Sequence, residues 1–262
     1  MRSPGRAAVG LSAAALAAQY LPSVVTLGQW TALRALPGGL CRWRGPVVGK
    51  VALTFDDGPS PEATPAFLDE LEALGLPGTF FCLGEHVRRH PDLVAEIRRR
   101  GHQVELHGQR HSHHLARSPR WVDRDLGQAV DSLRSCGVTP RWYRPSYGQA
   151  TGSTLLFARR HGLRTVLWSA WGKEWTTDDP TAVADRVAGG LGPGAIVLLH
   201  DDDTFGRPGM WRTGLAALPL IAAELRRRQL EAVTFDRLMG SDAAPAGPVA
   251  NGAVSRPGPG GT

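Results

Sequence analysis

Residues 51–59 have the sequence VALTFDDGP, an apolar run with strand character that ends directly in two aspartates. Similar short apolar runs recur along the chain, and several of them also end in polar residues. Runs that are apolar throughout are typical of strands buried on both faces of a parallel sheet. The sequence predicts strands over residues 51–55, 79–83, 103–106, 141–143, 164–168, 195–199 and 231–235.

Helical patterns fill the intervals between these strands. Apolar residues at i, i+3 and i+4 spacing, such as Phe67, Leu71 and Leu74, indicate amphipathic helices. Helices are predicted over residues 65–74, 91–100, 121–135, 153–161, 180–188 and 214–228. Strands that alternate with helices indicate an α/β fold, a parallel sheet wrapped by helices. We expect a single domain with a distorted (β/α)7 barrel, closed or nearly closed and similar to a TIM barrel.

The two ends of the chain differ from this central domain, which we place at residues 46–240. Residues 241–262 are mostly Ala, Gly and Pro and contain hardly any large apolar side chain. Such a segment cannot bury enough surface to offset its ordering entropy, so we predict a disordered tail. In residues 1–45, Arg2 and Arg6 precede an uncharged segment, 7–33, that is rich in Ala, Leu and Val.

This N-terminal segment has three interpretations. A signal peptide would use residues 7–14 as its apolar region and Ala15-Leu16-Ala17 as its cleavage site. A membrane anchor would use residues 7–33, which exceed the roughly 20 residues needed to cross a bilayer, although polar residues interrupt that run. The third interpretation is a cytoplasmic protein with an apolar N-terminal helix. We expect export, with the protein secreted or tethered to the membrane and therefore extracytoplasmic.

The composition disfavours two classes of site. The three cysteines, Cys41, Cys82 and Cys136, are isolated, with no CxxC spacing for a thiolate zinc site. A bridge between Cys41 and Cys136 stays open, although an odd count disfavours a disulfide framework. The net charge of +6 comes almost entirely from arginine, and the arginine runs are not interleaved with aromatic residues. We therefore expect no nucleic-acid partner, and we expect a monomer.

Residues able to do chemistry appear just after the predicted strands. TFDDGP (54–59) follows the first strand, HGQRH (107–111) the third and RPSYG (144–148) the fourth. Glu174-Trp175 follow the fifth strand, and LLHD (198–201) closes the sixth. The C-terminal ends of barrel strands converge on one face, where active sites lie. We therefore expect two carboxylates, two spaced histidines, an arginine and a further histidine to face one another across the barrel mouth.

Three of these residues form a candidate metal site. Asp57, His107 and His111 make a set of two histidines and one carboxylate, which leaves open positions for water and substrate. The adjacent aspartates can divide labour, with Asp57 binding the metal and Asp56 accepting a proton from the attacking water. The competing interpretations are a simple turn for the DDGP run and surface histidines. We expect a divalent metal, Zn²⁺ before Co²⁺, Ni²⁺ or Mn²⁺.

Taken together, these motifs resemble those of the polysaccharide deacetylase family, the NodB-homology enzymes of carbohydrate esterase family 4. TFDDGP, the spaced histidine pair, the RPxYG pattern, a Trp-bearing loop and LLH occur in the order that the family shows. The resemblance covers roughly residues 49–238. TFDDGP with the downstream histidine pair is specific, whereas RPxYG or LLH alone would be weak.

The resemblance implies a role for each matching residue. Asp56 matches the family's catalytic base, and Asp57, His107 and His111 match its metal ligands. The remaining matches are Arg144, which holds the base carboxylate; the backbone N–H of Tyr147, which stabilises the oxyanion; His200, the general acid; Leu198, the start of a small acetate pocket; and Trp175, an aromatic wall. From the residues alone, Trp171, Trp175 and Trp211 are candidates either to stack on sugar rings or to pack inside the barrel.

The chain departs from the family pattern in three places. Gly108 follows the first histidine, where Ser or Thr is usual, and Ser146 replaces the second proline of RPPYG. The usual DxxDW becomes WGKEW (171–175), so that Trp171 removes one aspartate and Glu174 replaces the other. Glu174 would then have to orient the general-acid histidine with one extra methylene. These changes put substrate preference and efficiency in doubt more than reaction type.

The expected function is that of a metal-dependent hydrolase that removes N-acetyl groups from N-acetylated amino-sugar polymers, such as peptidoglycan or chitin-like glycans, and releases acetate. One alternative keeps the fold and changes the substrate, as in an O-acetyl xylan esterase or another amide hydrolase. A second alternative is a non-catalytic carbohydrate-binding homologue, which the altered WGKEW motif alone supports.

Overall fold

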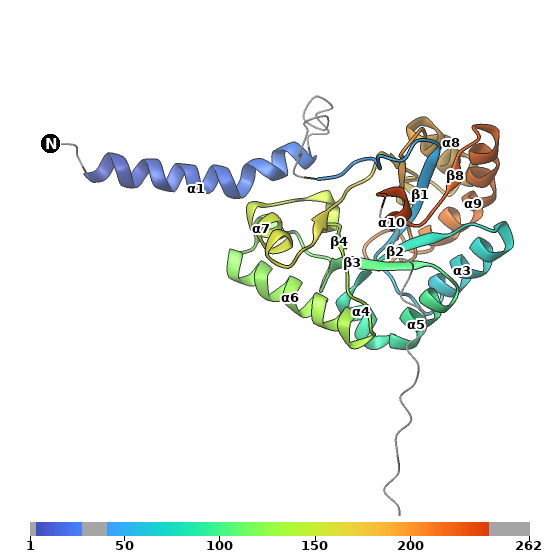
Figure 1. Cartoon of the computed structure of the whole chain (residues 1–262), viewed down its shortest axis with the longest axis horizontal. Coiled ribbons are helices and arrows are strands. Elements are labelled where there is room, and N and C mark those ends of the chain that lie inside the picture. Colours follow the sequence, from blue (N-terminus) through green and yellow to red (C-terminus); the bar gives the residue numbers. More distant parts are fainter. Residues whose placement is uncertain (1–3, 28–40, 241–262) are drawn as a thin grey trace, which may run out of the picture.

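The computed structural model describes residues 4–27 and 41–240, and Figure 1 shows their arrangement. The predicted tail at 241–262 lies outside the described residues. Each of the seven predicted strands contains at least a short stretch of observed strand, and a further strand, β6, was not predicted. The strands are β1 (Lys50–Asp56), β2 (Gly78–Leu83), β3 (Gln103–Gly108), β4 (Trp142–Tyr143), β5 (Arg164–Thr165), β6 (Ala170–Trp171), β7 (Ile196–His200) and β8 (Glu231–Ala232).

The helices follow the predicted ones closely, with two additions among the described residues of the domain. The α-helices are α1 (Pro4–Leu27), α3 (Ala63–Leu74), α4 (Gly84–Arg89), α5 (Pro91–Arg99), α6 (Pro119–Ser135), α7 (Gly152–Arg160), α8 (Pro180–Gly190), α9 (Met210–Arg227) and α10 (Phe235–Leu238). Short 3-10 helices are η1 (His114–Ala116), η2 (Ser146–Gly148) and η3 (Glu174–Thr176). The additions, α4 and α10, are too short to show an apolar period in the sequence.

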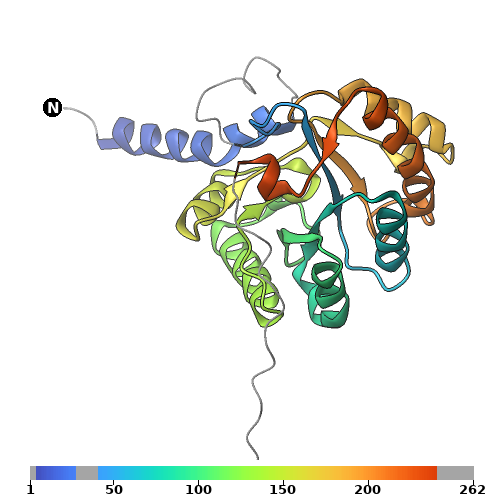
Figure 2. The ribbon, with the colours of Figure 1, turned by 45° about the vertical axis from the view of Figure 1, so that its right-hand side comes forward.

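All strand pairs are parallel, and the strand order is β5-β4-β3-β2-β1-β7-β6, with β8 paired to the start of β1. The sheet curls into an open barrel that helices surround, as the two views in Figures 1 and 2 show. In the described part of the chain β5 and β6 stand at opposite ends of the strand order, so the barrel is not closed by a strand pair.

The prediction of one strand over 164–168 was wrong beyond Thr165. Beyond Thr165 only Val166 still bonds to β4, through its N–H to the Tyr143 carbonyl (2.9 Å), and the chain then runs to β6 at the other end of the strand order. Arg42 lines this segment, because its N–H donates to Thr165 (2.9 Å) and its carbonyl accepts from Leu167 (2.7 Å). Val166 and Leu167 are fully buried. Burial inside the barrel, which a strand also requires, explains why this segment has a strand-like sequence.

Two apolar layers hold the domain together. Between the sheet and the helices, the Phe55 ring lies 5.0 Å from that of Phe67 on α3 and 4.9 Å from that of Phe80 on β2. Inside the barrel, Phe235 of α10 packs edge-on against Phe81 and Trp142. Burying one such ring contributes about 2 to 3 kcal/mol. The predicted strand over 231–235 therefore ends at Ala232, because Phe235 begins a helix that fills the barrel interior.

Helix α10, with the Phe235 side chain, fills the N-terminal end of the barrel. The backbone N–H of Phe235 donates to Thr79 at the start of β2, and β8 pairs with the first two residues of β1. The interior near the carboxyl ends of the strands therefore remains available for a site, as expected for a barrel of this kind.

The cysteines and the N-terminal helix complete the fold. Cys41, Cys82 and Cys136 are all free thiols, so no Cys41–Cys136 bridge exists.

Helix α1 extends away from the barrel, and its C-terminal end contacts the region of α7 (Figure 1). Within residues 4–27 and 41–240, no helix combines the length and apolarity that a membrane crossing requires.

Candidate active site

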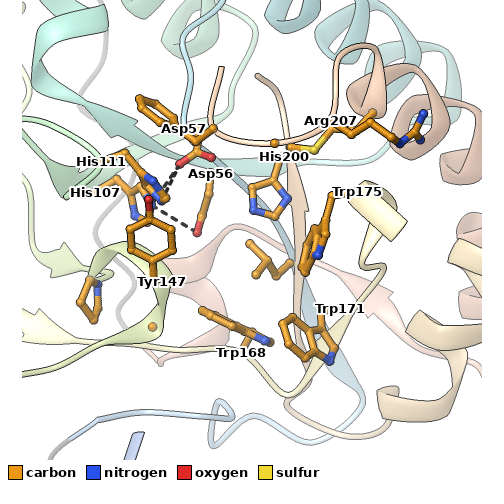
Figure 3. Close-up of a pocket in the computed structure, with 16 residues that line it drawn as sticks. Asp56, Asp57, His107, His111, Tyr147, Trp168, Trp171, Trp175, His200 and Arg207 are labelled. Carbon is orange, nitrogen blue, oxygen red and sulfur yellow. Dashed lines mark ion pairs between the residues drawn. The ribbon is translucent and has the colours of Figure 1, made fainter. Parts of the chain in front are cut away.

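A cavity of about 540 Å³ opens at the carboxyl ends of the strands (Figure 3). Strand register positions its two sides, because Asp56 on β1 is the direct partner of His200 on the adjacent β7. Nine of the twelve residues singled out in the sequence line the cavity: Asp56, Asp57, His107, His111, Tyr147, Trp171, Trp175, Leu198 and His200. Of the other three, Arg144 and Glu174 are fully buried directly behind Asp56 and His200, and Trp211 lies in the core.

Asp57, His107 and His111 converge on one corner of the cavity (Figure 3). The Asp57 Oδ1 atom lies 3.2 Å from Nε2 of His107 and 3.5 Å from Nε2 of His111. One potential ligand atom from each residue lies within 4.8 Å of the others. Asp57 Oδ1 is buried and has no hydrogen-bond partner. An unpaired buried carboxylate oxygen that faces two imidazole nitrogens fits a bound divalent cation.

The charge states of this corner also suit a cation. Burial acts to raise the pKa of Asp57, but the neighbouring imidazoles of His107 and His111 hold it well below its usual range. Burial lowers the pKa of His111 to about 4. At neutral pH the corner therefore presents a carboxylate and an uncharged imidazole, which are the forms that bind metals.

Backbone geometry fixes the positions of these candidate ligands. Asp57 has a φ of 78°, in the left-handed region, which turns its side chain into the cavity directly after β1. Gly108 has a φ of 124°, where a side chain would be strained, and this explains glycine after the first histidine. The Asp125 carboxylate accepts from the Gln109 N–H (3.1 Å). Ser146, the replacement for proline, donates to the His107 carbonyl (3.5 Å).

Asp56 lies beside this corner and is held from behind by a buried cation. The Arg144 Nη1 atom lies 2.6 Å from Asp56 Oδ1 and also donates to Thr54 (2.8 Å). Its guanidinium packs 4.1 Å from the centre of the Phe81 ring. The other Asp56 oxygen, Oδ2, lies 3.8 Å from Nε2 of His107. Asp56 therefore keeps one oxygen directed toward the ligand cluster.

His200 occupies the opposite side of the cavity and is also paired. Its Nδ1 lies 2.8 Å from Oε1 of Glu174, whose side chain is fully buried. The longer glutamate therefore reaches the histidine despite the changed motif. Burial acts to lower the pKa of His200, but the charge and hydrogen bond of Glu174, with smaller contributions from Asp57 and Asp56, raise it to about 9. The imidazole is therefore protonated at neutral pH and able to donate a proton.

Aromatic side chains form the wall on the His200 side. Trp175 lies edge-on to His200, with ring centres 5.5 Å apart, and Trp171 lies 5.7 Å from Trp175. Trp168 completes this wall 5.5 Å from Trp171, although sequence reasoning did not single it out. Trp211 is not part of the wall, because it is buried in the core between sheet and helices. Its packing role was one of the two open alternatives.

Two further features of the site were missed in the sequence. Asp201 is fully buried and holds the turn after Asp57, because its carboxylate accepts from the Gly58 N–H (3.2 Å) and the Thr64 hydroxyl (2.5 Å). Its position directly after His200 was the available signal. Phe205 packs its ring 4.6 Å from that of His111 and covers the ligand corner. It lies in the loop before α9, where no sequence pattern distinguishes it.

A family model described as polysaccharide deacetylase matches residues 46–166 of the chain. Among curated proteins, the chain is 36% identical over 152 residues to a chitooligosaccharide deacetylase of Rhizobium leguminosarum bv. trifolii, covering 58% of this chain and 71% of the relative. It is 31% identical over 207 residues to a peptidoglycan-N-acetylglucosamine deacetylase of Bacillus cereus, covering 78% of this chain and 94% of the relative.

A solved structure of a family 4 carbohydrate esterase from Streptomyces lividans, in complex with acetate, is also similar. It superposes with a TM-score of 0.66 at 29% identity, covering 76% of this chain and 99% of the other. The family model therefore spans the TFDDGP, HGQRH and RPSYG segments, and the solved structure shares the fold that presents them.

Proposed function

The chain belongs to the polysaccharide deacetylase family, and we propose that it removes N-acetyl groups from N-acetylated amino-sugar polymers and releases acetate. The observation that carries this proposal is the arrangement across the cavity. A carboxylate held by Arg144 and a protonated histidine held by Glu174 flank one cluster of metal-ligand side chains. Amide hydrolysis needs both groups, because water must lose a proton and the amine must gain one.

Asp57, His107 and His111 would hold the divalent metal, and we infer Zn²⁺ from the two imidazoles and one carboxylate, with Co²⁺, Ni²⁺ or Mn²⁺ as alternatives. When bound, such a cation polarises a carbonyl oxygen and makes a water molecule more acidic.

The proton transfers follow from the residues around this cluster. Asp56 takes a proton as water attacks the acetyl carbon, and Arg144 keeps its carboxylate oriented. The backbone N–H of Tyr147 donates to the oxyanion that develops. His200 then donates its proton to the sugar nitrogen as the C–N bond breaks. Acetate and a free amine leave, so that one water is consumed for each amide.

The walls of the cavity suit a sugar substrate. Trp171 and Trp175 supply aromatic faces on which pyranose rings stack, and Leu198 supplies an apolar surface for the acetyl methyl group. Peptidoglycan and chitin-like oligomers both carry the required acetamide, and the names of the two curated relatives point to these two substrates.

We also propose that the protein acts outside the cytoplasmic membrane, as a monomer. A peptidoglycan substrate would require export, which residues 1–45 would direct as a signal peptide or a tether. The catalytic domain would correspond to residues 46–240, followed by a tail without catalytic function.

An acetate-release assay tests the proposal. The full-length protein, loaded in turn with Zn²⁺, Co²⁺, Ni²⁺ and Mn²⁺, is given chitin oligomers, peptidoglycan and acetylated xylan, with Asp56→Asn as the matched inactive control. We expect acetate and free amine from an N-acetylated polymer with at least one metal. Acetate from xylan alone would identify an O-acetyl esterase, and sugar binding without release would identify a non-catalytic homologue.

A further inference from the structure

The C-terminal half of α1 makes specific polar contacts with the barrel. The Ser23 hydroxyl donates to the Ala150 carbonyl (2.8 Å), and the Ala150 N–H donates to the Thr26 hydroxyl (3.3 Å). The Gln19 Oε1 atom accepts from both the N–H (2.9 Å) and the hydroxyl (2.7 Å) of Ser153. Ser23 and Thr26 are only 2% and 6% exposed. These polar side chains are therefore buried against a backbone segment whose hydrogen bonds they complete.

The segment that α1 contacts also borders the cavity. Tyr147 and Gly148 line the cavity, and Ala150 follows two residues later, just before α7. Tyr147 has a φ of 57° and Gly148 a φ of 68°, so two consecutive residues are left-handed. A tyrosine in this conformation costs roughly 1 to 2 kcal/mol and persists only when its surroundings hold it. Contacts that fix Ala150 therefore help to hold the loop that carries Tyr147.

The start of α7 is capped from two sides. The Thr151 hydroxyl accepts from the Thr154 N–H (3.2 Å), as is usual at the beginning of a helix. The Ser153 N–H lies one residue earlier in the same first turn and needs another acceptor. Gln19 of α1 provides it. The N-terminal helix therefore completes the cap of α7, where the Tyr147 loop ends.

Gly152 provides independent evidence that this contact is built into the chain. A Cβ atom at Gly152 would lie 2.3 Å from the carbonyl oxygen of Ala18 on α1. Gly152 is not among the residues with positive φ, so its backbone conformation does not itself require glycine. The close approach of α1 is the feature that excludes a side chain at this position.

We propose that residues 18–26 of α1 brace the Tyr147 loop, with Gln19, Ser23 and Thr26 as positioning residues for the deacetylation reaction. The catalytic part of this inference rests on the proposed function, because it assigns the Tyr147 N–H to the oxyanion. The docking part does not, because it concerns contacts that can be measured without substrate. Removal of a signal peptide after Ala17 would leave the brace in place, whereas insertion of residues 7–33 into a membrane would exclude it.

Two matched pairs of variants of the full-length, metal-loaded protein test this brace. Thr26→Val keeps the side-chain shape and removes the hydroxyl that accepts from Ala150, whereas Thr26→Ser retains the hydroxyl. Ser23→Ala removes the other hydroxyl, and Val24→Ala is the control, because Val24 is 55% exposed on the same helix. Hydrogen exchange at the Ala150 N–H measures docking, and kcat and KM measure positioning.

We expect faster Ala150 exchange and a kcat about tenfold lower in Thr26→Val and Ser23→Ala, with KM and metal content little changed. Thr26→Ser and Val24→Ala should behave like the parent. Unchanged exchange would overturn the docking, and faster exchange with unchanged kcat would overturn the positioning role. A parent protein that releases no acetate would instead contradict the proposed function, while the exchange result would still decide whether α1 docks.

Gly152→Ala provides a further test, because it should shift the midpoint of thermal unfolding in opposite directions with α1 docked and with α1 undocked. Alanine can adopt the backbone conformation of Gly152 and loses less chain entropy on folding, so without the docked α1 this change should raise the midpoint of thermal unfolding. With α1 docked, the new methyl group meets the Ala18 carbonyl. We then expect a lower midpoint and faster exchange at Ser153. A raised midpoint with unchanged Ser153 exchange would overturn the proposal.

Discussion

The two sides of the cavity contain the same kind of ion pair, used in opposite ways. On one side Arg144 is paired with Asp56, whose free oxygen faces the ligand cluster. On the other side Glu174 is paired with His200, which faces the cavity. In each pair the partner that does not line the cavity is fully buried. One pair therefore presents its anion to the cavity, and the other presents its cation.

The choice of the buried partner decides which function each pair can perform. A guanidinium does not lose its proton in proteins, so Arg144 can never compete with Asp56 for the proton taken from water. Glu174, with smaller contributions from Asp57 and Asp56, raises the pKa of His200 to about 9, so in the proposed reaction the imidazole would hold a proton until the leaving nitrogen accepts it. The pairing of a fixed charge with a proton-carrying group thus separates a base from an acid within one small cavity.

Loss of the metal should have the largest effect, because neither the Asp56 side nor the His200 side of the cavity can then contribute to acetate release. His107→Ala removes one of three ligand side chains, so activity should fall to background and bound metal should drop sharply. Metal analysis of the purified protein, alongside acetate release, checks this. Full activity with a full metal content would remove His107 from the ligand set.

Asp56→Asn should impair only proton transfer from the attacking water. The amide cannot accept the proton from water, so acetate release should fall by about 10³-fold. Metal content should stay near that of the parent, because Asp57, His107 and His111 remain. Retained activity in this variant, measured with the same metal load, would show that another group takes the proton.

Glu174→Gln should impair the His200 side of the cavity by changing the protonation of His200. Burial would then lower the pKa of His200 without opposition from the Glu174 charge. As the pH rises, the imidazole would therefore lose its proton at a lower pH than in the parent, where the pKa is about 9. We expect the basic limb of the kcat profile to move to lower pH, with kcat about 10- to 100-fold lower at pH 8. Glu174→Asp, which keeps the charge, is the matched control. An unmoved basic limb would show that Glu174 does not set this pKa.

The same pairing predicts a stability effect with a defined sign. Because the pKa of His200 is raised on folding, its protonated form stabilises the fold below the unfolded value near 6.5. This contribution is lost as the pH rises from about 6.5 through 9. In metal-free protein, thermal unfolding should therefore show a falling midpoint over that interval, and His200→Gln should make the fall shallower. Equal slopes in both proteins would contradict the raised pKa.

The smallest effect is expected at the aromatic wall. Trp171→Ala removes one ring from the His200 side without touching either ion pair. We expect KM for a polymeric substrate to rise a few-fold, with kcat nearly unchanged. Trp211→Phe is the control, because Trp211 is buried in the core and should affect stability instead of KM. A large fall in kcat for Trp171→Ala would place this ring closer to the chemistry.

Features encoded by neighbouring residues could be predicted from the sequence. The TFDDGP run places Asp56 and Asp57 at the end of a buried strand, and the helices and the main strands follow local apolar periods. The segment after Thr165 was mistaken for strand, because residues buried inside the barrel carry the same apolar signal. The bracing contact between α1 and the Tyr147 loop has no local signal, because its partners are more than 120 residues apart.

The sequence by itself determined which chemical groups this protein carries, that a parallel α/β barrel would present them at its strand ends, and the family to which they point. The resemblance implied that Arg144 holds Asp56, and the structure shows this contact. Only the tertiary structure decided that Glu174 reaches His200 despite the changed motif and that α1 docks beside the Tyr147 loop. The physical reason is that periodicity and motif spacing act over a few residues along the chain. Charge state and hydrogen-bond partnership instead depend on distance and burial in space, between groups that the chain order keeps apart.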